Sequence, residues 1–182
     1  MSSKWGEWQG SRCRGASTEE NGTTRADVDE GIERVRFLSG WPRGIDAATL
    51  QAVSDWFSGI DLEESRRRFR TSLEIGGVSA FWEDRLFGVR ERDAVRFTVG
   101  DVNIEGTNPC PRCAVPARDS LSGNDTIGFQ KRFSDLRHSH YPSWACQPDR
   151  IDDFYHLAIN TRVSPTEHGK VLRVGDFVSV RF

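Results

Sequence analysis

The chain has 182 residues, of which 25 are Lys or Arg and 27 are Asp or Glu, so its formal net charge is only −2. A chain of this length can bury one core of useful size, and its charge does not indicate binding to nucleic acid or to an acidic membrane. No stretch approaches the ~18 apolar residues that a membrane-spanning helix needs, and the first residues lack the pattern of a secretory signal. We therefore expect a cytoplasmic protein that binds neither nucleic acid nor a membrane.

The composition along the chain predicts a tail followed by one domain. Residues 1–30 carry almost no aliphatic side chains, which predicts a disordered N-terminal tail, and residues 31–182 are expected to form the domain. In the first half of that domain, alternation and helical spacing predict three elements separated by breaks. They are a strand over Ile32–Leu38, a helix over Ala47–Phe57 opened by Asp46, and a strand over Phe69–Ile75, with a solvated basic turn over Leu62–Arg68.

The second half of the domain is β in character. Short alternating segments separated by Gly-Asp pairs predict a hairpin and several further strands, with one short helix among them. The predicted strands are Ala94–Val99, Val102–Ile104, Tyr155–Val163, Val171–Val174 and Phe177–Phe182, and the helix lies within Thr126–Arg137. This pattern predicts a mainly β fold, a compact β-barrel with a few short helices.

The segment Asn108-Pro109-Cys110-Pro111-Arg112-Cys113 is the strongest chemical feature of the sequence. Two thiols stand three positions apart with an arginine between them, and two prolines predict a stiff loop. An arginine fixed beside a thiol favours the thiolate and offers paired donors to a phosphate.

Three chemistries compete for this motif. A zinc site needs four ligands, and the chain has no second C-x-x-C, although Cys146, His138, His140 or His156 could complete one. A thioredoxin-type dithiol needs a helix directly after the motif, and Ala114-Val115-Pro116 does not open one cleanly. The third chemistry is an anionic cofactor held by a thiolate and an arginine, and two loop cysteines without a function are the remaining alternative.

An ordered series of segments resembles one known family. The segments are F-R-T-S-L-E-I-G-G (Phe69–Gly77), A-F-W-E-D-R-L-F-G (Ala80–Gly88), V-R-F-T-V (Val95–Val99), N-P-C-P-R-C, H-L-A-I-N (His156–Asn160) and V-L-R-V-G-D-F-V-S-V (Val171–Val180). In this order they resemble the MOSC domain, the family related to the C-terminal domain of molybdenum cofactor sulfurase, which includes the mitochondrial amidoxime-reducing component. The resemblance covers roughly Ile45 to Phe182.

The resemblance implies a MOSC-type β-barrel that binds the molybdenum cofactor, a molybdopterin. It places the protein ligand of molybdenum, and the catalytic thiol, on Cys113. It places cofactor contacts on Arg112 and Arg70, and it places an asparagine contact of the relatives on Ser72, since this chain reads R-T-S where relatives read R-P-N. Asn160, on a late predicted strand, is a further candidate cofactor contact, with a surface or ladder position as the alternative. The family is also associated with pyridoxal phosphate.

Two functional classes follow from these expectations. The first is a molybdenum-dependent reductase of a small N-hydroxylated or related substrate, served by a separate electron-donor protein, or a carrier of sulfur or cofactor on Cys113. The second is a non-catalytic binding module with a degenerate pocket and no cofactor, or a zinc-stabilised barrel.

Overall fold

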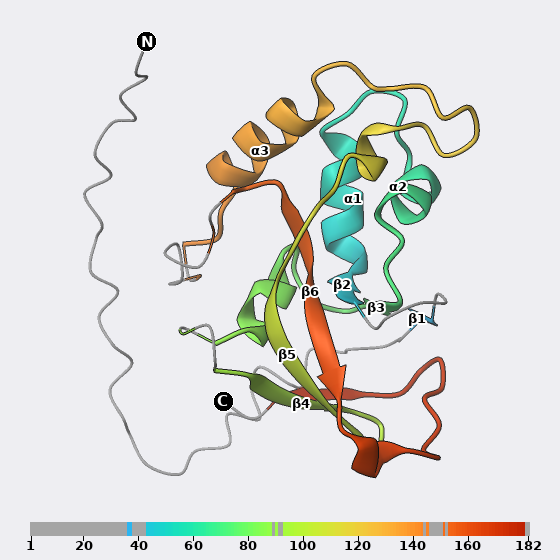
Figure 1. Ribbon diagram of the computed structural model, residues 1–182, viewed down its shortest axis with the longest axis vertical. Coiled ribbons are helices and arrows are strands. Elements are labelled where there is room, and N and C mark those ends of the chain that lie inside the picture. Colours follow the sequence, from blue (N-terminus) through green and yellow to red (C-terminus); the bar gives the residue numbers. More distant parts are fainter. Residues whose placement is uncertain are drawn as a thin grey trace.

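A computed structural model describes residues 36–37, 43–88, 90, 93–143, 145, 151 and 153–180 (Figure 1). The expected tail over residues 1–30 lies outside the described residues, as does most of the predicted strand Ile32–Leu38. No helix in the described part of the chain is long and apolar enough to cross a membrane.

In the described part of the chain, seven strands form one sheet in the order β1-β3-β2-β6-β5-β4-β7, with β2 and β3 parallel and every other neighbouring pair antiparallel. The expected hairpin is present, since β4 pairs with β5 from Val95↔Gly106 to Val99↔Val102. The strands are β1 (Arg36–Phe37), β2 (Arg43–Asp46), β3 (Leu73–Ile75), β4 (Val95–Val99), β5 (Val102–Pro111), β6 (His156–Val163) and β7 (Val178–Val180).

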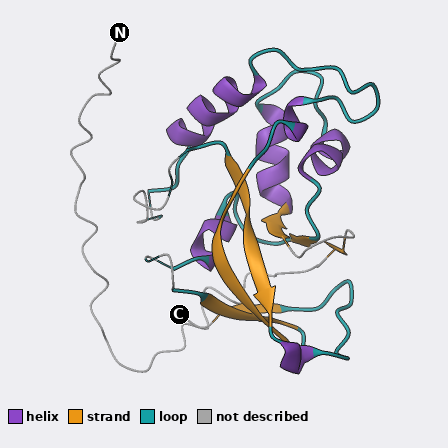
Figure 2. Ribbon diagram, in the orientation of Figure 1, coloured by secondary structure: helices purple, strands orange, loops and turns teal. Residues whose placement is uncertain are grey.

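The three α-helices lie together at one end of the long β5–β6 pair, and β4 crosses near its other end (Figures 1 and 2). The predicted helices are confirmed as α1 and α3, with ends shifted by a few residues. The α-helices are α1 (Ala47–Asp55), α2 (Leu62–Phe69) and α3 (Phe129–Ser139), and the 3-10 helices are η2 (Trp82–Leu86), η3 (Val115–Ala117) and η5 (Pro165–Glu167).

The fold is rich in strands, but helix and strand are roughly balanced, and the described strands do not close into the expected barrel. Closure requires the two edge strands to hydrogen-bond to each other. Among the described residues β1 and β7 span two and three residues and pair only with β3 and β4. The predicted strand Val171–Val174 is also absent, because this segment is a turn that leads into β7.

The predicted basic turn over Leu62–Arg68 is wrong, since this segment is helix α2. Asp61 is its N-cap and accepts a hydrogen bond from the backbone N–H of Glu64 at 2.7 Å. Arg68, expected on a solvated face, is buried and donates to the Glu64 carboxylate at 2.5 Å and to the Thr126 hydroxyl at 3.0 Å. A buried arginine is tolerated here because charged and polar acceptors surround it.

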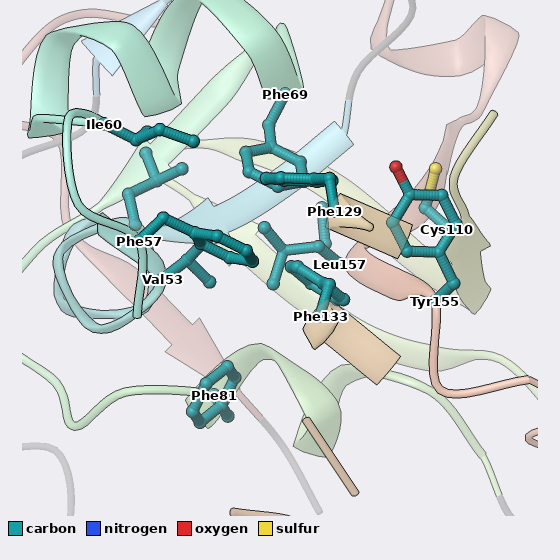
Figure 3. Packing of buried hydrophobic residues seen from close by; sticks show 12 residues of the cluster. Val53, Phe57, Ile60, Phe69, Phe81, Cys110, Phe129, Phe133, Tyr155 and Leu157 are labelled. Atoms are coloured by element: carbon teal, nitrogen blue, oxygen red, sulfur yellow. The ribbon is translucent and has the colours of Figure 1, made fainter. Parts of the chain in front are cut away.

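A cluster of aromatic and aliphatic side chains packs the three α-helices against the start of β6 (Figure 3). Phe129 stacks on Phe57 with 4.5 Å between ring centroids, and Phe133 packs edge-on against Tyr155 at 5.4 Å. Cys110 lies at the border of the same cluster, so the core reaches the segment that carries the two cysteines.

Candidate functional site

The two cysteines of the C-x-x-C motif have different environments. Cys110 is 5% exposed and belongs to the core, whereas Cys113 is exposed, and both thiols are free. Strand β5 continues through Pro111, and the N–H of Arg112 still bonds to the carbonyl of Tyr155, the residue directly before β6, at 2.9 Å. The expected stiff loop is therefore the extended end of a strand as far as Arg112.

Because the end of β5 is extended, the two cysteines are poorly placed for a thioredoxin-type disulfide or for a shared zinc ion. An extended chain rises about 3.3 Å per residue, so Cα atoms three residues apart approach a separation of about 10 Å, beyond the ~7 Å limit for a disulfide. Successive side chains also point to opposite faces, which fits one buried and one exposed sulfur. Among the described residues, no three His, Cys, Asp or Glu side chains gather where they could hold a metal ion; Cys146 lies outside them.

The prolines fit into β5 because its pairing with β6 is interrupted. The register shifts between Gly106 and Asn108 and again between Pro109 and Pro111, as at β-bulges. The second shift places an additional residue on β6, where Ala158 has a φ of 70°. These two irregularities determine the direction in which the end of β5 leads into Cys113.

Arg112 is held by several acceptors at once. Its Nη2 donates to the backbone carbonyl of Phe69, and its Nη1 lies 3.4 Å from both the carbonyl of Leu157 and the Sγ of Cys110. Its guanidinium also lies over the Phe69 ring, with 5.3 Å from Cζ to the centroid. The sequence predicted that Arg112 contacts a cofactor. In the structure its side chain is half-buried and connects three segments of the chain.

Arg70 and Ser72 follow the Phe69 carbonyl directly. Arg70 was expected at the start of a strand and is instead the C-cap of α2, with a φ of 49° and its N–H bonded to the carbonyl of Arg66. It is exposed, and no described residue makes a hydrogen bond or ion pair with its guanidinium. Ser72 is buried at the entry to β3.

Asn160 lies on β6, three residues beyond Leu157, and is half-buried. It pairs with Asn108, and its side-chain amide lies 3.5 Å from the carbonyl of Pro109. Its backbone carbonyl accepts from the Thr107 hydroxyl at 3.0 Å. Asn160 thus joins β6 to the bulged part of β5 beside the cysteine segment.

Tyr155 belongs to the same neighbourhood and was not among the predicted site residues. Burial raises the pKa of its hydroxyl to about 12, with the positive charge of Arg112 lowering it and the Cys113 thiolate raising it. Figure 3 shows the Tyr155 hydroxyl and the Cys110 sulfur at one border of the aromatic cluster. No sequence pattern indicated Tyr155, because it approaches Arg112 only when β5 pairs with β6.

A second polar group lies inside the protein. The Arg137 side chain on α3 is 1% exposed and forms an ion pair with Asp84, which is 3% exposed. The Nη2 of Arg137 lies 3.4 Å from Nε2 of His156, and its guanidinium is stacked over Phe81 with 4.1 Å from Cζ to the centroid. His156, which the sequence offered only as a possible zinc ligand, is 2% exposed. Its contact with the ion pair could not be inferred from the sequence, because Arg137 and Asp84 approach it only in the folded chain.

Three further polar residues lie at the surface or in a turn. His138 and His140, which the sequence offered as possible zinc ligands, are exposed. Asp119 accepts from the backbone N–H groups of Leu121 and Ser122 in a turn.

Comparison of the chain with models of known protein families found no match, and comparison with curated protein sequences found none. The geometry of the site therefore carries the functional argument.

Proposed function

We propose that the chain is a MOSC-type protein that binds the molybdenum cofactor through the thiolate of Cys113. One observation supports this most: Arg112 bonds to the carbonyl of Phe69, which brings the segment after α2 against the end of β5. Arg70 follows Phe69 and Cys113 follows Arg112, and both side chains are exposed. The Cys113 thiolate, a soft ligand, and the Arg70 guanidinium therefore project into solvent from adjoining segments. The guanidinium has no hydrogen-bond or ion-pair partner among the described residues.

These two groups match what a molybdopterin requires. A thiolate is the soft ligand that a molybdenum centre takes, and an arginine pairs with a phosphate through two parallel hydrogen bonds. Asn160 would contact the pterin from β6, whereas Ser72, which the resemblance placed at the cofactor, is buried at the entry to β3 and is assigned no contact. The bound cofactor would supply two-electron redox chemistry toward a small N-hydroxylated or related substrate, with electrons from a separate donor protein.

The sulfur-carrier version of the proposal uses the same thiol. Cys113 is exposed and Cys110 is buried, so Cys113 is the thiol that a partner can reach. Its thiolate would attack the outer sulfur of a donor protein's persulfide, which forms the Cys113 persulfide and releases the donor's thiolate, and an acceptor thiolate would take that sulfur in the same way. The open sheet and the buried Ser72 favour instead the non-catalytic module, a related fold whose pocket no longer takes the cofactor.

Metal and pterin content of the purified chain tests the proposal. We expect protein from a molybdenum-replete host to carry both in near-stoichiometric amounts. Cys113→Ala should lose most of the molybdenum, whereas the matched variant Cys110→Ala should retain it if it folds. Neither metal nor pterin in the folded wild type would reject cofactor binding, and zinc lost in both variants would favour a structural metal site.

A further inference from the structure

Arg112 joins three segments that are far apart in the sequence. Its guanidinium donates to Phe69, 43 residues before it, and to Leu157, 45 residues after it, while its own strand supplies the Cys110 sulfur. A guanidinium is a planar fork with five N–H donors, so it can serve several fixed acceptors in one plane. Both Nη atoms therefore already have acceptors within the protein, which makes Arg112 a poor candidate for binding a phosphate.

The two carbonyls that Arg112 holds share an unusual backbone feature. Each directly precedes a non-glycine residue in the left-handed region: Arg70 follows Phe69 with φ 49°, and Ala158 follows Leu157 with φ 70°. The angle φ sets how the preceding peptide group is turned, and L-residues other than glycine disfavour positive values. In both segments a disfavoured backbone conformation accompanies a carbonyl that faces the same guanidinium.

We propose that Arg112 is a positioning residue, which fixes the places from which Cys113 and Arg70 project, and that Arg70 supplies the cation toward the cofactor. Cys113 is one residue beyond Arg112, and Arg70 is one residue beyond the carbonyl that Arg112 holds. The inference rests on the proposed function for the identity of the ligand. The hydrogen bonds of Arg112 that support the positioning role are made within the protein and do not involve the cofactor.

Hydrogen exchange of the full-length chain, purified from a host that makes no molybdopterin, tests the positioning role. The variants are Arg112→Met, Arg112→Lys and Arg70→Met. A matched control is Arg132→Met, because Arg132 also lies over a phenylalanine, with 5.4 Å from its Cζ to the Phe57 centroid.

We expect Arg112→Met to speed amide exchange roughly tenfold in peptides covering residues 69–72 and 157–160, with α3 and β4 changing less. It should also lower Tm by roughly 5–10 °C, since hydrogen bonds from a charged donor are lost. Arg112→Lys keeps the charge but not the fork, so it should fall between Arg112→Met and the wild type. Arg70→Met and Arg132→Met should leave exchange in both segments unchanged.

A parallel measurement separates positioning from direct contact. In a molybdenum-replete host, Arg70→Met should lose cofactor although its exchange pattern is that of the wild type. Wild-type exchange at both segments in Arg112→Met and Arg112→Lys would overturn the proposal, and so would full cofactor content in Arg70→Met when the wild type is loaded. If Arg112→Met does not fold, Arg112→Lys decides the question by the same exchange measurement. If the wild type binds no molybdenum, the exchange result still decides whether Arg112 holds the two segments, so the two proposals fail separately.

Discussion

The Nη2 of Arg137 lies 3.4 Å from Nε2 of His156 in the interior of the protein. The other ring nitrogen, Nδ1, lies 3.0 Å from the carbonyl of Asp153. If Nδ1 carries the proton and donates to that carbonyl, Nε2 is left as an acceptor for Arg137. A second proton on this buried ring would place its positive charge beside that of Arg137, so the neutral imidazole is favoured.

The stability of the protein should therefore fall in mild acid. Burial, with the charge of Arg137 adding to it, lowers the pKa of His156 to about 4, against about 6.5 in an unfolded chain. The unfolded chain takes up the proton first, so the contribution of His156 is complete above pH 6.5 and is lost as the pH falls toward 4. The gap between the two pKa values corresponds to about 3 kcal/mol.

Urea unfolding between pH 5 and 8 measures this dependence. The free energy of unfolding of the wild type should fall by about 1 kcal/mol per pH unit below pH 6.5. His156→Gln should flatten the curve in this range, while the exposed His138→Gln should leave it unchanged. Equal slopes in the wild type and in His156→Gln would show that His156 is not the titrating group.

Removing one charge of the Arg137–Asp84 ion pair should strongly lower the free energy of unfolding. Asp84→Asn leaves a buried guanidinium without its carboxylate, for which we expect a loss of about 3–5 kcal/mol. The matched control is Asp135→Asn, which removes one member of an exposed pair with Lys131, where the side chains are 61% and 82% exposed. That change should cost about 0.5 kcal/mol or less, and equal urea midpoints for the two variants would contradict the account.

Glu64 should hold the turn at Ser120 against helix α2. Its carboxylate accepts from the Ser120 N–H at 2.8 Å and from Arg68 at 2.5 Å, and hydrogen bonds from Ser120 and Arg68 lower its pKa to about 2 despite the opposing effect of burial. This stabilisation is present above pH 4.5 and is lost as the pH falls toward 2. We expect Glu64→Gln to speed tryptic cleavage after the exposed Arg118 by several-fold. Glu63→Gln, an exposed neighbour, should cleave like the wild type, and an unchanged rate in Glu64→Gln would exclude this role.

Gly106 is required by a close approach between β5 and η2. A Cβ at this position would lie 1.7 Å from the carbonyl oxygen of Leu86, a backbone atom that cannot turn aside. We expect Gly106→Ala to cost about 3 kcal/mol or more, or to abolish folding. Gly123→Ala meets no atom within 4 Å and carries only the strain of φ 75°, which should cost about 1 kcal/mol. Thermal unfolding and soluble yield compare the two, and a smaller loss for Gly106→Ala would contradict the packing.

Elements with a strong local pattern could be predicted from the sequence, and others could not. The apolar spacing around Leu50 and Val53 predicts α1, and the Gly-Asp turn at Gly100 predicts the β4–β5 hairpin. Helix α2 was missed because its residues are mostly charged. Besides Glu64 in the same helix, the acceptors around buried Arg68 are on Pro116, Asp119 and Thr126, which lie 48 to 58 residues away in the chain.

The candidate site shows the same division. The motif indicated Cys113 and Arg112 as chemically special, but the prolines beside them suggested a loop where β5 continues as a bulged strand. That Arg112 would face two backbone carbonyls could not be inferred, since both belong to segments that approach it only in the folded chain. Local patterns thus identify reactive residues, whereas their partners depend on tertiary structure.

The most direct test of the central proposal is X-ray absorption at the molybdenum edge of the loaded protein, for the wild type and for Cys113→Ser. A serine oxygen can keep the metal in place but removes one sulfur. We predict that the number of sulfur ligands falls by one and the number of oxygen or nitrogen ligands rises by one in the variant. The same sulfur count in both proteins, or no molybdenum in the wild type, would contradict the assignment of Cys113 as the ligand.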